Sequence, residues 1–143
     1  MTTSNSSKLF KTVREENSLC YYISSVGQPL NSILTINAGI NASDFKNALS
    51  LIKKEVYNMK KGKFSDEDII KGKITYINSL KELEDSEQSL ISLYAGIEYL
   101  NSDDIPTRFN KINRVTKSDV VKLANKIHLD TVYLLEGDLD EEN

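Results

Sequence analysis

The side chains that most hydrolases use as a general base or as a cysteine nucleophile occur only once each in this sequence. His128 is the single histidine and Cys20 the single cysteine among 143 residues. Any Ser-His-Asp or Cys-His mechanism would therefore have to use His128. His128 stands at the end of an expected helix, where an imidazole commonly caps the last carbonyl groups. Cys20 has no histidine nearby in the sequence and resembles a small buried apolar residue. We expect neither to be catalytic.

A catalytic zinc site is not expected either. The chain contains no HExxH or HxxEH run. One histidine and one cysteine do not make the usual set of three protein ligands for catalytic zinc. The sequence therefore predicts that this chain binds no metal and no cofactor, and that it is inactive as an enzyme on its own.

The charge balance and the hydropathy pattern exclude two classes of partner. Eighteen basic and 21 acidic residues give a net charge of −3, without a basic stripe that would hold a phosphate backbone. No apolar run approaches about 18 residues, and the first seven residues are polar, so neither a membrane span nor a secretory signal is expected. A single cysteine cannot close an internal disulfide, which agrees with a reducing compartment. We therefore predict a cytoplasmic protein that binds neither nucleic acid nor a membrane.

The first 40 residues predict a short helix followed by a β-hairpin. Ser6-Ser7 can cap a helix whose Leu9, Phe10 and Val13 fall on one face. Aromatic and branched residues then predict strands at 19–23 and 33–36, with turn residues between them at 27–31.

From Ser43 onward the apolar residues repeat with the period of a helix. Gly62 stands where the first of these helices should end, and Ser65 begins a capping signature for the next. The pattern is interrupted at Asp85, which predicts a kink or a break in a long helix. Further helix starts are expected near Pro106 and at Thr116.

A last strand is predicted at 131–135, followed by a tail in which acidic residues predominate. The resulting order of elements predicts an α+β fold, with a small antiparallel sheet and helices packed on one face. Three strands are few for so many helices, and at least one edge of the sheet would remain open. Such an edge must be covered or paired, and self-association through it is one possible outcome.

Four segments of the sequence, taken with the order of elements, form a recognisable set. The first runs from Ser7 to Tyr22, where a short helix ends in an Arg-Glu pair and a strand follows with a Leu-x-Tyr. The other three are Asn37-Ala-Gly-Ile40, Lys61-Gly-Lys-Phe-Ser-Asp-Glu-Asp68 and Val115-Thr-Lys-Ser-Asp-Val-Val121. In this order they resemble the C-terminal, non-zinc-binding domain of pitrilysin/insulinase-type zinc metallopeptidases. The sequence of residues 19–23 is most similar to that of Firmicutes-type members, which occur as paired and partly inactive homologues.

The resemblance implies that the chain is part of an α/β sandwich domain in a clam-shell protein. In that family, zinc is bound in the N-terminal half, and an arginine and a tyrosine from the C-terminal half help to hold the peptide near the metal. Matched to this sequence, these two substrate-binding residues are Arg14 and Tyr21. Read from the residues alone, Arg14 could instead form a surface ion pair with Glu15 or Glu16. Likewise, Tyr21 could be a core residue whose hydroxyl reaches the edge. Tyr22 is assigned to packing.

The departures from the family pattern predict that this is one portion of a longer protein. Neither the zinc helix nor its third ligand is present, nor are the elements that normally precede the Ser7 segment. We expect a disordered or added start at 1–6, a partial C-terminal domain at 7–138 and an acidic tail at 139–143.

The predicted function is a non-catalytic portion of a zinc metallopeptidase that contributes chamber wall and substrate contacts to peptide proteolysis. Its expected partners are the remainder of its own polypeptide, or a zinc-binding homologous subunit, and a peptide substrate. One alternative is a structural or partner-binding scaffold without a peptidase role. A third possibility is an unrelated, self-contained α+β binding domain.

Overall fold

The computed structural model of the chain describes residues 10–16, 18–28 and 31–136. The predicted cap at Ser6-Ser7, the predicted start at 1–6 and the acidic tail at 139–143 lie outside these residues.

Two strands, β1 (Tyr22–Gln28) and β2 (Ile33–Gly39), form an antiparallel hairpin. Tyr22 pairs with Gly39 at one end and Gln28 with Ile33 at the other. The predicted hairpin is therefore confirmed, but β1 begins three residues later than expected. Ser18 has a φ of 52°, and the Ser18 and Leu19 amides donate to the carbonyls of Arg14 and Val13 at 3.0 and 3.1 Å. These bonds close the end of a helix, so the chain becomes a strand only after them.

That helix is η1 (Phe10–Glu15), a short π-helix. Together with the sheet it encloses the small core at this end of the molecule. Val13, Cys20 and Ile23 are its buried members. Half-buried apolar residues of β2 and of the first long helix surround them. Burial of Val13 and Ile23 fixes η1 against β1, which sets where Arg14 emerges.

Five α-helices follow a short 3-10 turn, η3 (Ala42–Asp44). They are α1 (Phe45–Lys60), α2 (Asp66–Glu84), α3 (Glu87–Leu100), α4 (Ile105–Arg114) and α5 (Lys117–Asn125). The predicted helix starts at Ser65 and Thr116, the end before Gly62 and the break at Asp85 are confirmed. The first helix begins at Phe45 instead of Ser43, and the last ends at Asn125, three residues before His128. Capping boxes begin α2 at Ser65 and α5 at Thr116, and the long helical stretch breaks at Asp85-Ser86, between α2 and α3. Gly62 follows α1 with a φ of 67°, which only glycine adopts without strain.

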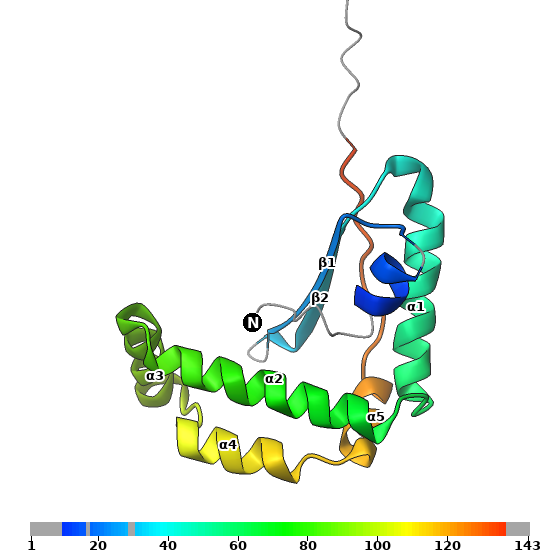
Figure 1. Cartoon of the computed structure of the whole chain (residues 1–143). Helices are drawn as coiled ribbons and strands as arrows, with labels where there is room; N and C mark the ends of the chain where they lie inside the picture. Colours follow the sequence, from blue (N-terminus) through cyan, green and yellow to red (C-terminus); the bar gives the residue numbers. More distant parts are fainter. Residues whose placement is uncertain (1–9, 17, 29–30, 137–143) are drawn as a thin grey trace, which may run out of the picture.

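Figure 1 shows two parts of the molecule. The hairpin, η1 and α1 lie together, whereas α2 runs away from them, with α3 at its far end and α4 returning beside it. The chain then comes back to α1 through α5. Two side-chain hydrogen bonds join the end of α1 to α5 and the residues after it. The Asn125 side-chain amide donates to the Lys60 carbonyl at 3.1 Å, and the Lys60 ammonium donates to the Ile127 carbonyl at 2.6 Å.

The predicted strand at 131–135 is wrong for this structure. Among the residues that the structure describes, the sheet has two strands, and residues 131–135 form neither helix nor strand. A strand needs a paired neighbour, and no described strand pairs with this segment. The α+β class is nevertheless confirmed, with η1 and α1 packed against one face of a small antiparallel sheet. Among the helices that the structure describes, none combines the length and the apolar character needed to span a membrane.

Candidate functional site

Tyr21 lies directly before β1, at the end of the sheet where η1 meets it. Its amide donates to the Gly39 carbonyl at 2.7 Å, which holds this residue beside the last pair of the ladder. The side chain is 66% exposed. Its hydroxyl donates to Asn41 Oδ1 at 2.5 Å. Tyr21 is therefore not a core residue: it presents an oriented phenol to solvent.

Asn41 is a site residue that the sequence reasoning missed. It follows β2 and precedes η3, and its side-chain amide donates to Asp44 Oδ2 at 3.3 Å while its oxygen accepts from Tyr21. A chain of hydrogen bonds thus runs from Tyr21 through Asn41 to Asp44. The available signal was its position, because Asn41 comes immediately after the segment Asn37–Ile40 that carries part of the family resemblance.

Tyr22 turns to a different neighbour. Its ring lies across Gly39, so a methyl group at Gly39 would come within 2.7 Å of the ring atom Cδ1. Tyr22 therefore packs its ring against Gly39 of the neighbouring strand, where the absence of a side chain leaves room for the ring. The Tyr21 hydroxyl contacts Asn41, whereas the Tyr22 ring contacts Gly39. Tyr22 is therefore a matched reference for Tyr21.

Arg14 stands in the last turn of η1 with an exposed side chain. The structure brings its charge close to Cys20, the residue before Tyr21. Burial raises the pKa of the Cys20 thiol, and the positive charge of Arg14 opposes this by favouring the thiolate. Arg14 and Tyr21 are therefore at the two ends of one short connection between η1 and β1, with Cys20 between them.

The surface beside Tyr21 is open rather than enclosed. A hollow with a volume of about 40 Å³ is lined by Ser18, Leu19, Cys20, Tyr21 and Asn41. This volume suits one or two water molecules and is far too small for a peptide side chain of any size. The arrangement can therefore offer hydrogen-bond donors to a ligand that lies across the surface, but it cannot enclose one.

The charge of Arg14 predicts a measurable effect on the cysteine. Arg14→Ala should slow alkylation of Cys20 by iodoacetamide and move its pH profile to higher pH, because removing the cation leaves less thiolate at any given pH. Cys20 is the only cysteine, so mass spectrometry of the intact chain reports on it alone. Arg14→Lys, which keeps the charge, is the control. An unchanged rate in Arg14→Ala would mean that the guanidinium does not act on this end of β1.

His128 and the metal-ligating side chains form no second site in the described part of the chain. No group of three or more His, Cys, Asp or Glu side chains there could hold a metal ion. His128 lies beyond the end of α5 and is exposed. Within the described residues, the amides of Lys126 and Ile127 close the helix end by donating to the Leu123 and Ala124 carbonyls, and no described hydrogen bond joins His128 to it.

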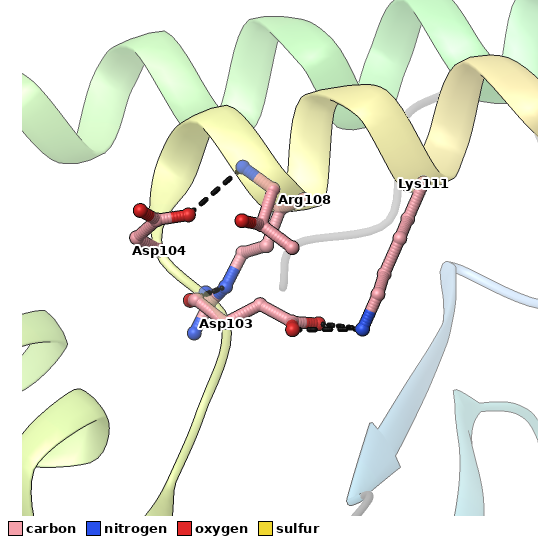
Figure 2. A network of polar contacts seen from close by, with 5 residues as sticks. Asp103, Asp104, Arg108 and Lys111 are labelled. Atoms are coloured by element: carbon pink, nitrogen blue, oxygen red, sulfur yellow. Dashed lines mark hydrogen bonds and ion pairs between the residues drawn. The ribbon is translucent and has the colours of Figure 1, made fainter.

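The charged cluster at the start of α4 has a structural explanation (Figure 2). Lys111 Nζ lies 2.7 Å from both Asp103 carboxylate oxygens, and Arg108 Nε donates to the Asp103 carbonyl at 2.7 Å. Asp104 caps the helix by accepting from the Thr107 amide at 2.9 Å. Hydrogen bonds from the Thr107 side chain and then from its amide lower the pKa of the Asp104 carboxyl. Such contacts fix a helix start and its approach loop, and this exposed ion pair adds little to stability.

Comparison with known proteins gives consistent matches along the chain. A family model described as "Peptidase M16 inactive domain" matches residues 1–76. A "Probable inactive metalloprotease YmfF" from Bacillus subtilis (strain 168) is 36% identical over 132 residues, which are 92% of this chain and 31% of the relative.

Two solved structures share the fold. A crystal structure of a conserved protein from Enterococcus faecalis V583 matches with a TM-score of 0.76 and 25% identity, over 87% of this chain and 30% of the other. A protease from Helicobacter pylori matches with a TM-score of 0.65 and 20% identity, over 88% of this chain and 31% of the other. The chain thus spans about a third of the length of the proteins it resembles.

Proposed function

The chain belongs to the family of the peptidase M16 inactive domain, and we propose that it is a non-catalytic C-terminal portion of an insulinase/pitrilysin-like zinc metallopeptidase. The family match confirms the resemblance that the sequence predicted. In this proposal, the chain contributes chamber wall and substrate contacts to the proteolysis of peptides. It does so in the cytoplasm, joined to a zinc-binding half that is either the remainder of its own polypeptide or a homologous subunit.

The observation that supports substrate contact is the pairing of an exposed phenol and a cation on one short connection. Tyr21 and Arg14 can each donate to a peptide carbonyl, and such bonds strengthen when negative charge develops on that oxygen during hydrolysis. The Tyr21 hydroxyl has a single proton, which it now gives to Asn41. In the proposed complex this proton turns from Asn41 Oδ1 to the substrate, so Asn41 orients the phenol only before the substrate binds.

In this proposal, the zinc ion belongs to the other half of the assembly. The described residues do not form a zinc site, because no three of their His, Cys, Asp and Glu side chains lie close enough together to bind a metal ion. When bound in the other half, zinc would activate a water molecule for attack on the peptide. The described residues of this chain bind and orient the peptide only.

A scaffold without peptidase activity is the second candidate, and one observation favours it. The Bacillus relative is described as a probable inactive metalloprotease. If the whole protein is inactive, Arg14 and Tyr21 are remnants, and the chain serves to hold a partner. The coding sequence beside this one separates the two candidates, because an HxxEH half upstream or in an adjacent gene supports a peptidase assembly.

The proposal predicts that the chain alone neither retains zinc nor cleaves peptides. Metal analysis after mild chelation should find well below one zinc per chain, and a fluorogenic peptide should remain intact. Addition of the zinc-binding half should restore cleavage. Stoichiometric zinc in the isolated chain, together with cleavage that a strong chelator abolishes, would overturn the assignment.

A further inference from the structure

The Asn41 side chain lies between two groups of opposite hydrogen-bonding character. Its oxygen Oδ1 accepts from the Tyr21 hydroxyl at 2.5 Å, and its nitrogen Nδ2 donates to Asp44 Oδ2 at 3.3 Å. The backbone holds all three residues in place, because the Tyr21 amide donates to the Gly39 carbonyl at 2.7 Å and the Asp44 amide donates to the Asn41 carbonyl at 2.9 Å. The three side chains therefore form a row at one end of the hairpin, with Asn41 in the middle.

Asp44 determines which end of the Asn41 amide faces Tyr21. An ionised carboxylate offers acceptors only, whereas a carboxamide has acceptors on its oxygen and donors on its nitrogen. The Asn41 nitrogen therefore turns toward Asp44, and its oxygen is left facing Tyr21. A carboxamide oxygen cannot donate, so the Tyr21 hydroxyl has to supply the proton of this bond.

This orientation of Asn41 opposes the contact proposed for Tyr21. The hydroxyl has one proton, and donation to a peptide carbonyl takes that proton away from Asn41. The Tyr21 and Asn41 oxygens would then face each other without a proton between them. Half a turn of the Asn41 amide would present its nitrogen to the Tyr21 oxygen, but it would also aim Oδ1 at the Asp44 carboxylate. Two acceptors form no bond, so Asp44 holds the amide in the orientation that occupies the Tyr21 proton.

We propose that Asp44 is a positioning residue that restrains the Tyr21 hydroxyl by fixing the direction of the Asn41 amide. This role rests on the proposed contact between Tyr21 and the peptide, and it adds a restraint on that contact. An amide at position 44 can donate as well as accept, so it allows the Asn41 amide to turn over. Asn41 then donates to the Tyr21 oxygen, which keeps the phenol oriented and leaves its proton for the peptide.

The direction of the Tyr21 hydrogen bond can be measured without a substrate. In the full chain labelled with carbon-13 at tyrosine Cζ, Asp44→Asn should move the Tyr21 resonance to lower chemical shift, because a hydroxyl that donates strongly has more phenolate character than one that accepts. Loss of the resonance in Tyr21→Phe assigns it. Asp44→Glu, which keeps a carboxylate, should leave it much nearer its original position. Asp66→Asn, which removes a carboxylate from the first turn of α2, is the matched control. An unmoved resonance in Asp44→Asn, or an equal shift in Asp66→Asn, would overturn the proposal.

Turnover by the complete assembly tests the consequence for the substrate. Asp44→Asn should raise kcat/KM for a fluorogenic peptide by about two- to tenfold, the equivalent of one hydrogen bond that no longer has to break. The gain should vanish when Asp44→Asn is combined with Tyr21→Phe, and a gain that persists there would show that Asp44 does not act through Tyr21.

The same kinetics separate a failure of this restraint from a failure of the proposed function. If Tyr21→Phe lowers kcat/KM but Asp44→Asn does not raise it, Tyr21 contacts the substrate and the role of Asp44 is wrong. If Tyr21→Phe has no effect in an assembly that cleaves peptides, the substrate role of Tyr21 is wrong, and the role of Asp44 falls with it.

Discussion

Tyr21→Phe in the complete assembly with its zinc-binding half should lower peptide turnover by about 10- to 1,000-fold, the effect of removing one donor to the transition state. The substitution removes one hydroxyl and leaves the ring in place. Because the lost bond strengthens as the oxyanion develops, kcat should fall while KM changes little. Steady-state kinetics with a fluorogenic peptide measures both.

Two controls separate the hydroxyl from its surroundings. Tyr22→Phe removes the neighbouring phenol, which lies over Gly39 instead of facing Asn41, and should leave turnover unchanged. Asn41→Ala removes the acceptor but keeps the Tyr21 hydroxyl, so its effect should be smaller than that of Tyr21→Phe. If the intact protein cleaves peptides and Tyr21→Phe behaves like Tyr22→Phe, the assigned role of Tyr21 is wrong.

Arg14→Ala belongs to the same prediction and should fall in the same range. Arg14→Lys should recover only part of the loss, because an ammonium cannot reproduce the planar fork of donors in guanidinium. Arg114→Ala, at the exposed end of α4, is the matched control for loss of one arginine. Full activity of Arg14→Ala in a cleaving assembly would leave the scaffold as the better description of this chain.

The helices could be predicted from sequence because their signals are local. Ser65 with Asp68, and Thr116 with Asp119, each satisfy the first amides of a helix within four residues of chain. The start of β1 could not be placed in the same way. It depends on where η1 ends. The amides of Ser18 and Leu19 close that end, and Ser18 has a positive φ that its residue type does not predict.

The candidate site also combines residues that could be identified from sequence with one that depends on the folded structure. Arg14 and Tyr21 came from the resemblance to a family, since an arginine beside two glutamates and a tyrosine in an aromatic segment have ordinary structural explanations. Asn41 bonds to Tyr21 across 20 residues of sequence, a contact that exists only once the hairpin has formed. Formation of the strand predicted at 131–135 requires a neighbouring strand from a distant part of the sequence, and no described strand pairs with it.

The buried contact between η1 and the sheet should dominate the stability of this end of the molecule. Ile23 is 4% exposed and lies in the core cluster with Val13 and Cys20. Ile23→Ala should lower the free energy of unfolding by about 2 to 5 kcal/mol, the combined effect of lost apolar burial and the cavity left behind. Ile23→Val should cost about 0.5 to 1.5 kcal/mol. Urea unfolding followed by circular dichroism measures both.

Ile33→Ala is the matched control, since Ile33 is in the partner strand but 52% exposed, and its effect should stay well below that of Ile23→Ala. The same cluster joins Val13, next to Arg14, to Cys20, next to Tyr21. Ile23→Ala should therefore also expose the Cys20 thiol and speed its alkylation, opposite to the slowing expected for Arg14→Ala. If Ile33→Ala proves as costly as Ile23→Ala, the outer face of the hairpin is covered in solution and the buried side is not its main anchor.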